Sequence, residues 1–473
     1  MGDEIDTIHF TKSDFEEFHR RLAGETALLG RWFDGGRFEE TEPIGGFEVE
    51  AWLVDRAGLP VPRNEEFLQH LDHPLVVPEL ARFNVELNAA AVRLRGDALS
   101  ATQRGIEETW RRCGEVAGEL GMEAMLVGIL PSLRDSELTL ENLSPMKRYR
   151  ALNEQVFRLR RGKPITLDIE GREHLRAIHH DVMLEAAATS FQIHLQVSPA
   201  KAVRYYNASV ILSAPMVAMS ANSPFLFGRD LWDETRIPLF EQAVRLAPLD
   251  GPEPNRVTLG TDYARASLHE FFAENLASYP VLLPTLMDEP PERLAHVRLL
   301  NGTIWRWNRP LIGFNEQGVP HVRIEHRVMP AGPSIADMIA NAALYFGLAE
   351  MLANAPAAPE AALPFAQAQA NLYAAARDGL GAQIAWLDGR TVAMRELLLR
   401  ELLPLARRGL EKLEFDREDI ARYLGIIESR VASGQNGAAW QRAHVARHGA
   451  DMQALTCAYR EHQRSGAPVH EWT

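Results

Sequence analysis

Three short stretches of the sequence carry acidic or histidine side chains that a divalent-metal site could gather. The first stretch, GGFEVEAWLVD (45–55), places Glu48 and Glu50 two residues apart in an apolar run that predicts a β-strand. Because side chains alternate along a strand, both carboxylates would lie on one face. Adjacent carboxylates repel each other and are costly to desolvate unless a cation lies between them. The pair therefore indicates a cation site on the face of a sheet.

The other two stretches show the same alternation. His194 in SFQIHLQV (190–197) shares a polar face with two glutamines, and apolar residues point the opposite way. Glu325 in PHVRIEHRV (320–328) shares a face with Arg323 and Arg327. Such a row can hold a metal-bound phosphate, because the carboxylate binds the cation and the arginine binds the phosphate oxygens.

A second cation site is expected beside Glu50. Glu86 lies in the alternating run FNVELN, where it shares a face with two asparagines, and Glu79 precedes it by seven residues. Oxygen ligands suit Mg²⁺, which keeps bound waters that phosphate oxygens can replace. A histidine among carboxylates is also compatible with Mn²⁺.

Each of these features also has an ordinary structural explanation. A polar strand face is usually solvated, and a histidine opposite an apolar face is more often structural. An Arg/Glu/Arg row is commonly a surface ion-pair ladder. The metal interpretation gains weight because acids or histidine recur on four separate strands.

The composition is that of an ordinary globular protein, with 473 residues, 46% hydrophobic content and a formal net charge of −14. No basic tract stands out, which gives little support for a nucleic-acid partner.

Two distant cysteines outside any zinc spacing predict no disulfide and fit the cytoplasm. The N-terminal MGDEIDTIHF lacks the apolar core of a signal peptide. The longest apolar stretch is broken by Ser213, Pro215 and Ser220 and ends near Asn222, so it predicts a buried helix and no membrane span.

The elements that must position these residues change along the chain. From the N-terminus we expect an amphipathic helix within 7–40, a β-rich region over 44–100, a helix over 101–121 with a short strand after it, and a helix over 144–161. A strand pair then leads to the His194 strand and the long buried helix, and 229–330 mixes loops, helices and strands. Beyond about 335 we expect helices, with a linker at 353–364 and a kink or break at Pro404. Arg377 could point toward the active site, but a helix surface charge is the stronger expectation.

Taken in order, the motifs GFEVE, the acid pair seven apart, TSFQIHLQV, SANSPF and RIEHR resemble the glutamate–cysteine ligase family, in particular its plant-type and bacterial carboxylate–amine ligase branch. The resemblance covers roughly 40–350, and SANSPFLFGRDLWDETR is among its most specific stretches. It implies an α+β, glutamine-synthetase-like fold, in which a curved antiparallel sheet with flanking helices holds metals on its concave face. We accordingly expect a catalytic domain over 1–350 and a helical C-terminal region over 351–473 packed on it.

The resemblance also implies an activity and a set of roles. The activity is ATP-dependent joining of a carboxylate, usually the γ-carboxylate of glutamate, to an amine such as cysteine, as in glutathione biosynthesis. Glu48, His194 and Glu325 would hold the metal that bridges the transferred phosphate. Glu50, Glu79 and Glu86 would hold the metal near the acyl substrate, although Pro78 and Leu80 could place Glu79 in a turn. Arg327 would stabilise the phosphoryl group, with Arg148 in KRYRAL and Arg309 in NRPLIG near substrate or phosphate.

Some points depart from the family or stay open. His326 lies between Glu325 and Arg327, where many relatives have an apolar residue. The sequence selects neither the acceptor amine nor the base that deprotonates it, and it leaves open whether the chain forms a homo-oligomer. Two other functions remain as alternatives. One is phosphoryl transfer to a nitrogen acceptor, as in guanidino kinases, and the other is nucleotide or metabolite binding without catalysis.

Overall fold

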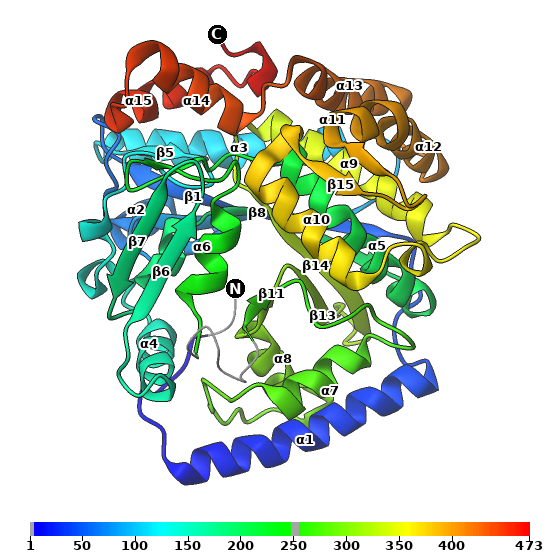
Figure 1. Cartoon of the computed structure of the whole chain (residues 1–473). Helices are drawn as coiled ribbons and strands as arrows, with labels where there is room; N and C mark the ends of the chain where they lie inside the picture. The colour runs from blue at the N-terminus through cyan, green and yellow to red at the C-terminus, as the bar shows by residue number, and fades with distance from the viewer. Residues whose placement is uncertain (1–3, 247–254) are drawn as a thin grey trace.

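The computed structural model describes residues 4–246 and 255–473. The first three residues of MGDEIDTIHF, and the part of the mixed region over 247–254, lie outside the described residues. Figure 1 shows a central curved sheet with helices on its flanks, α1 along one end of the molecule and the C-terminal helices at the opposite end.

The central sheet is antiparallel throughout, with the strand order β13-β14-β8-β1-β3-β2, and β4 and β5 pair with β1 off this path. Its strands are β1 (Ile44–Val54), β2 (Val76–Pro78), β3 (Asn84–Asn88), β4 (Val92–Arg93), β5 (Glu123–Met125), β8 (Ser190–Val197), β13 (Asn308–Phe314) and β14 (Pro320–Pro330). All three motif stretches therefore lie in one sheet, and the predicted α+β fold class is confirmed.

Alternation along β1 gives the sheet two different faces. The odd-numbered residues from Gly45 to Ala51 are buried, whereas the even-numbered ones are partly open. Phe47 stacks on Phe191 at 5.6 Å and meets Phe346 of α9 edge-on at 5.9 Å. The apolar face thus packs on helices, and Glu48 and Glu50 are left on the other face.

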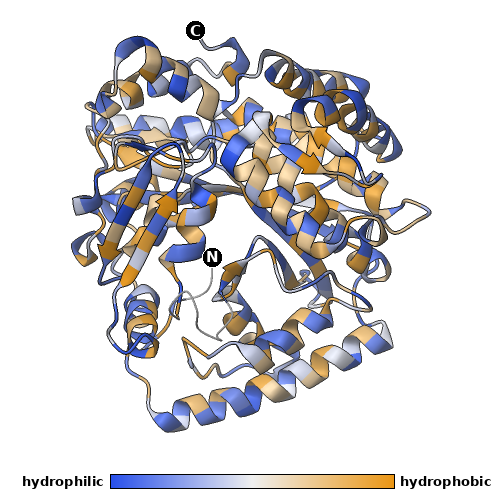
Figure 2. Cartoon of the chain, viewed as in Figure 1, coloured by the Kyte–Doolittle hydropathy of each residue, from blue (hydrophilic) through white to orange (hydrophobic). Residues whose placement is uncertain are grey.

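Two apolar helices, α5 (Pro199–Ser220) and α9 (Ile335–Ala353), cover the apolar face. Most of their residues are buried, and Figure 2 shows hydrophobic residues concentrated among the helices beside the sheet. The long buried helix expected before Asn222 is α5. By length and composition, α9 is the one helix in the described part of the chain that could cross a membrane, and 94% of its most apolar window is buried inside the protein.

The remaining helices surround this core. They are α1 (Lys12–Gly35), α2 (Asn64–Leu71), α3 (Ala98–Glu119), α4 (Lys147–Leu159), α6 (Arg236–Ala243), α7 (His269–Ser278), α8 (Ala295–Gly302), α10 (Phe365–Asp378), α11 (Met394–Leu397), α12 (Leu403–Lys412), α13 (Arg417–Ser433), α14 (Gly437–His448) and α15 (Met452–Arg464). The short strand pairs are β6 (Ile165–Glu170) with β7 (His174–His179), β9 (Phe225–Leu226) with β10 (Arg229–Asp230), β11 (Val257–Thr258) with β12 (Trp305–Arg306), and β15 (Gln383–Ala385) with β16 (Thr391–Ala393).

The expected break near Pro404 is present, but it is not a simple kink. A π-helical turn over Leu398–Leu402 separates α11 from α12, and Pro404 falls in the first turn of α12. A proline there lacks the N–H that an uninterrupted helix would need, and the wider turn accommodates this loss.

The C-terminal helices join the central sheet through α9. Both α12 and α13 pack on α9, and Arg430 of α13 forms a buried ion pair with Asp337 at 2.7 Å. The other carboxylate oxygen of Asp337 accepts a hydrogen bond from the backbone N–H of Val469 at 3.0 Å. One continuous hydrophobic core runs from Phe18 to Trp472.

Candidate active site

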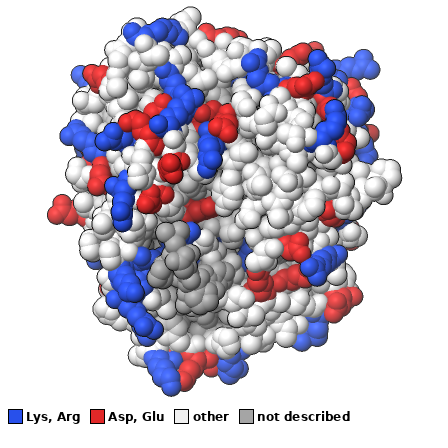
Figure 3. All heavy atoms as spheres, in the orientation of Figure 1, with Lys and Arg blue, Asp and Glu red and all other residues white. Residues whose placement is uncertain are grey.

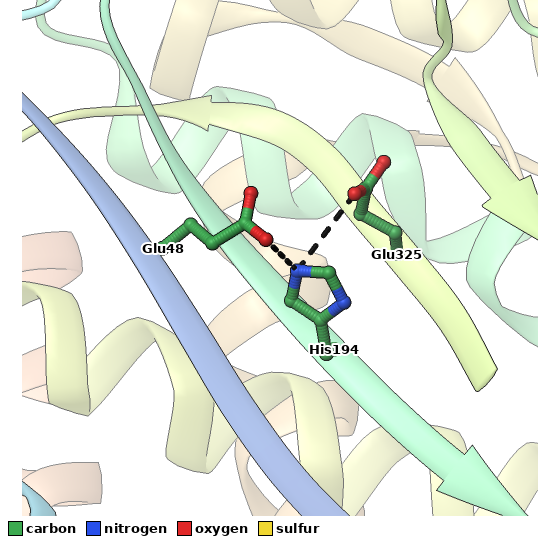
Figure 4. A group of neighbouring side chains, drawn as sticks. All are labelled: Glu48, His194 and Glu325. Carbon is green, nitrogen blue, oxygen red and sulfur yellow. Dashed lines mark ion pairs between the residues drawn. The ribbon is translucent and has the colours of Figure 1, made fainter. Parts of the chain in front are cut away.

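The first acidic group lies on three neighbouring strands of the open face. The register places His194 opposite Gly46 on one side and opposite Glu325 on the other. His194 Nε2 lies 3.0 Å from Glu48 Oε1 and 3.7 Å from Glu325 Oε1, as Figure 4 shows. One ligand atom from each residue falls within 4.8 Å of the others. Strand alternation and register together produce this convergence.

Both carboxylates of this group are held in the ionised state. Burial raises the pKa of Glu48, but the charge and hydrogen bond of His194 outweigh it and lower the pKa to about 2. Glu325 is also buried, and Arg309, Arg327 and His194 lower its pKa. Arg309 binds both oxygens of Glu325, at 2.7 and 3.0 Å, from the paired strand β13.

In the second acidic group the surroundings raise the pKa values of the carboxylates instead of lowering them. Glu50 faces Glu86 across the β1–β3 pair, and Glu79 follows directly after β2. Oxygens of these three carboxylates also fall within 4.8 Å of one another. Burial and the charges of Glu48 and Glu50 raise the pKa of Glu86 to about 7, and burial with Glu86 and Glu50 raises that of Glu79 well above its usual range.

Both groups fit a divalent cation. Three carboxylates packed together repel each other unless a cation or a proton neutralises them. Among the described residues Glu79 Oε1 is buried without a hydrogen-bond partner, which matches an atom kept for coordination. The donor sets are three carboxylates in one group, and two carboxylates with an imidazole in the other. They suit Mg²⁺, and the imidazole also suits Mn²⁺.

Arg327 lies between the two acidic groups. The β8–β14 register shifts between His326 and Met329, which marks a β-bulge at Arg327. Bulges re-aim side chains, and here Arg327 Nη1 donates to Gln192 and to Glu325, the latter at 3.0 Å. The Gln192 amide in turn donates to Glu50 Oε1 at 2.9 Å.

The bulge depends on a buried ion pair that sequence reasoning missed. Arg236 donates to the backbone carbonyls of Arg327 and Val328, and it pairs with Glu234 at 3.2 Å. Glu234 also accepts the backbone N–H of Asn222 at 2.8 Å. Glu234 and Arg236 belong to SANSPFLFGRDLWDETR, a stretch that the sequence already singled out. It did not show that these two residues form an ion pair that supports the bulge.

Arg323 was placed on the correct face, but no role was assigned to it. Among the described residues its buried Nε has no hydrogen-bond partner. Burial lowers the pKa of Arg323, and this effect outweighs Glu48 and Glu325, which raise it. A guanidinium with free donors beside two carboxylates is available for an anionic ligand.

The other arginines and His326 have different surroundings. Arg148 on α4 donates to Tyr149 at 2.9 Å, and among the described residues no hydrogen bond or ion pair joins it to either acidic group. Arg377 is exposed and lies over the Trp232 ring at 5.0 Å, as expected for a surface charge. His326 is buried on the helix face, where it stacks on Tyr345 at 4.5 Å, and burial lowers its pKa to about 3.

A small cavity opens beside Glu50 and Arg327. Its volume is about 20 Å³, and its lining residues are Glu50, Glu185, Ala188, Ser190, Arg236, Phe240, Trp307 and Arg327. Burial and the charge of Glu50 raise the pKa of Glu185 to about 8. Sequence reasoning missed Glu185 because it lies in a 3₁₀ turn, Met183–Ala187, which has no strand periodicity.

Comparisons with known proteins show which family and fold the chain is similar to. The chain is 24% identical over 412 residues to a putative glutamate–cysteine ligase 2-3 of Frankia alni, a match that covers 85% of the chain but only 40% of that relative's length. The fold resembles the glutamate–cysteine ligase of Francisella tularensis solved in complex with AMP, with a TM-score of 0.59, 13% identity and 90% coverage of both chains. It also resembles a bifunctional glutathione synthetase from Pasteurella multocida, with a TM-score of 0.58, 13% identity and coverage of 94% of this chain and 55% of that one. The model of glutamate–cysteine ligase family 2 matches residues 44–458, and the chain belongs to that family.

Proposed function

We propose that the protein is an ATP-dependent carboxylate–amine ligase. The observation that carries this proposal is the placement of two separate acidic groups on one sheet face with Arg327 between them. Phosphoryl transfer to a carboxylate brings several negative charges together, and such a face can bind them all. Figure 3 shows acidic and basic side chains interleaved over the surface in view, so charge of one sign is not gathered there.

The proposed chemistry has two steps. A carboxylate oxygen of the substrate attacks the γ-phosphorus of ATP, ADP leaves, and an acyl phosphate forms. The nitrogen of the amine then attacks the carbonyl carbon, inorganic phosphate leaves, and the nitrogen loses a proton. Divalent cations held by the two acidic groups would neutralise the phosphates and the attacking carboxylate, which otherwise repel each other.

Residues of the chain supply the remaining positive charge. We assign Arg327 to the transferring phosphoryl group, whose oxygens gain charge in the transition state. Arg309 orients Glu325 through its two hydrogen bonds. Arg323, with its free Nε, is suited to a phosphate oxygen or a substrate carboxylate. Arg148 stays a candidate substrate residue that would have to act from α4.

Glutamate as the carboxylate and cysteine as the amine are the first substrates to test. The family, and the name of the Frankia relative, support this choice. The AMP bound to the Francisella enzyme supports an adenine nucleotide as co-substrate. We further propose that residues 1–350 form the catalytic domain and that 351–473 support it.

The test is to trap the acyl phosphate. The protein is incubated with ATP, Mg²⁺ and glutamate but no amine, and hydroxylamine is then added. We expect ADP and a glutamyl hydroxamate, identified by mass. Phosphate retained on a nitrogen acceptor would instead show a kinase. If no carboxylate in a broad panel gives a hydroxamate while ATP still binds, the protein is a nucleotide-binding protein and the ligase proposal is wrong.

A further inference from the structure

The bulge that carries Arg327 is held from outside the sheet through three backbone carbonyls. Arg236 donates to the carbonyls of Arg327 and Val328. The third carbonyl belongs to Ala331, directly after β14, and it accepts a hydrogen bond from the side-chain amide of Asn222 at 2.8 Å. Arg236 and Asn222 therefore anchor the backbone at the bulge and just beyond it.

Asn222 also connects the two anchors to each other. Its backbone N–H donates to Glu234 Oε2 at 2.8 Å, and Glu234 Oε1 pairs with Arg236 at 3.2 Å. Asn222, Glu234 and Arg236 are almost fully buried, so none of their polar groups can exchange a lost partner for solvent at little cost. A shift of Asn222 would act on Ala331 directly and on Arg236 through Glu234.

The C-terminal helices set the orientation of the Asn222 amide. Its Nδ2 donates to the hydroxyl of Tyr459 on α15 at 2.8 Å, and its Oδ1 accepts from Gln441 on α14 at 3.0 Å. Tyr459 and Gln441 are both completely buried. Together with Ala331 they use both hydrogens and the oxygen of the amide, which fixes it in a single orientation.

Both C-terminal partners are closely packed in place. A Cβ atom at position 437, the start of α14, would overlap the side-chain oxygen of Asn222, so only Gly437 lets this helix come so near. The Tyr459 ring meets Trp440 and Trp472 edge-on, at 5.8 and 5.0 Å. Close packing of this kind transmits a change at one side chain to its neighbours.

We propose that Tyr459 and Gln441 are positioning residues for Arg327. Acting through Asn222 and the buried ion pair, helices α14 and α15 hold the bulge so that the Arg327 guanidinium meets the transferring phosphoryl group. The inference rests on the proposed function for the role of Arg327. It gives the C-terminal helices a part in turnover that is separate from their packing on α9.

A purely structural role is the competing explanation, because buried hydrogen bonds stabilise a protein wherever they lie. Tyr423 of α13 is the matched case. Its buried hydroxyl donates to Gln103 of α3 at 2.7 Å, so this bond joins two helices and does not lead to the bulge. Loss of either tyrosine hydroxyl should lower the urea midpoint by a similar amount, but only loss of the Tyr459 hydroxyl should misplace Arg327.

The experiment measures hydroxamate formation by the full-length Tyr459→Phe variant, with Tyr423→Phe as the control. We expect kcat of Tyr459→Phe to fall about fivefold or more, because misplacement of a reacting group by about 1 Å can cost about a hundredfold. The KM for ATP should stay within about twofold of wild type, since the lost interaction is made in the transition state. Tyr423→Phe should keep both constants close to wild type.

A double-mutant cycle with Arg327→Ala separates positioning from stability. If Tyr459 acts through Arg327, Tyr459→Phe should cause no further loss of kcat once the guanidinium is absent. A structural effect would lower kcat by the same factor in both backgrounds. Gln441→Met removes the other C-terminal partner of Asn222 and should behave like Tyr459→Phe in this cycle.

Crystal structures of the wild type and of Tyr459→Phe provide a measurement that needs no activity. We expect the Arg327 guanidinium to move and its Nη1 to lose the hydrogen bond to Gln192 or the one to Glu325, which is 3.0 Å long in the wild type.

Three results would overturn the proposal. They are a kcat of Tyr459→Phe equal to that of Tyr423→Phe, equal losses in the two backgrounds of the cycle, or an Arg327 guanidinium that stays in place in the variant crystal. Failure of the ligase function is distinguishable, because the wild type would then form no hydroxamate, while the crystal structures would still decide whether Tyr459 positions Arg327.

Discussion

Glu48 and Glu50 lie two residues apart on the same face of β1, yet their pKa values shift in opposite directions. Burial raises the pKa of both, but only Glu48 has His194 at 3.0 Å to reverse the effect. For Glu50 burial prevails over Arg327 and the Ser190 hydrogen bonds. One strand thus supplies a carboxylate whose ionised form is favoured by its protein neighbours and another whose ionised form a bound cation would favour.

Removing the charge of Glu48 should abolish turnover without unfolding the protein. Glu48→Gln deletes a ligand charge but little volume, so we expect ADP release to fall by about a hundredfold or more. Glu325→Gln should have the same effect on turnover, but it also leaves Arg309 and Arg327 without their carboxylate, so Glu48→Gln is the cleaner variant. Turnover near that of wild type, with circular dichroism unchanged, would contradict the site assignment.

Mg²⁺ should stabilise the protein more as pH rises. The pKa of Glu86 is about 7 in the folded chain against an ordinary value of 4.5. The metal-free folded state therefore binds extra protons in this range, and its free energy of unfolding falls as pH increases from about 4.5 to 7. A bound cation replaces those protons, so the gain in Tm on adding Mg²⁺ should be larger at pH 7.5 than at pH 5.5. Calorimetry with Mg²⁺ or EDTA at both pH values measures this, and an equal gain would count against cation binding by Glu86.

Arg327→Ala should lower kcat far more than ATP affinity. The guanidinium meets charge that grows in the transition state, so we expect a loss of about 10²–10³ in kcat with a small change in the KM for ATP. Arg377→Ala is a suitable control, because that guanidinium is exposed over Trp232. A rise in the ATP KM with kcat unchanged would instead make Arg327 a nucleotide-binding residue.

Arg236→Met should destabilise the fold and misplace Arg327. Glu234 would be left buried without its cationic partner, at a cost of about 3–5 kcal/mol, and the carbonyls of the β14 bulge would lose their donor. Urea denaturation measures this loss. Adding Glu234→Gln should recover part of the stability but not the activity, since the bulge carbonyls still lack Arg236.

Truncation after residue 355 should give an unstable protein. It would remove Arg430 from Asp337, both of which are almost fully buried, and would expose the surface of α9 that α12 and α13 cover. Size-exclusion chromatography and thermal melting test this prediction. A monomeric, active 1–355 fragment would show that the C-terminal helices are dispensable.

Strand periodicity accounts for the part of the site that the sequence could predict. Once a run such as FEVEAWL is taken as a strand, its two faces follow from the alternation of side chains, and so does the face that carries Glu48 and Glu50. The same reasoning placed His194 and Glu325, which the register brings opposite each other.

The site residues that the sequence did not predict lie at features without a regular spacing of side chains. The bulge at Arg327 adds a register shift that no alternation rule predicts, and Arg236 reaches it from a helix about ninety positions earlier in the chain. Glu185 lies in a 3₁₀ turn, and it lines the same cavity as Phe240 because η3 (Met183–Ala187) packs against α6. Such contacts are set by tertiary packing, which local sequence does not encode.

His326 and its two chain neighbours in β14 lie on opposite faces of the sheet and have different surroundings. Its ring stacks on Tyr345, and its Nδ1–H donates a hydrogen bond to Asn308 Oδ1 at 2.7 Å, all on the face turned away from Glu325 and Arg327. A change at position 326 would therefore act on the packing against Tyr345 and Asn308. A change at Glu325 or Arg327 would act on the charges of the opposite face.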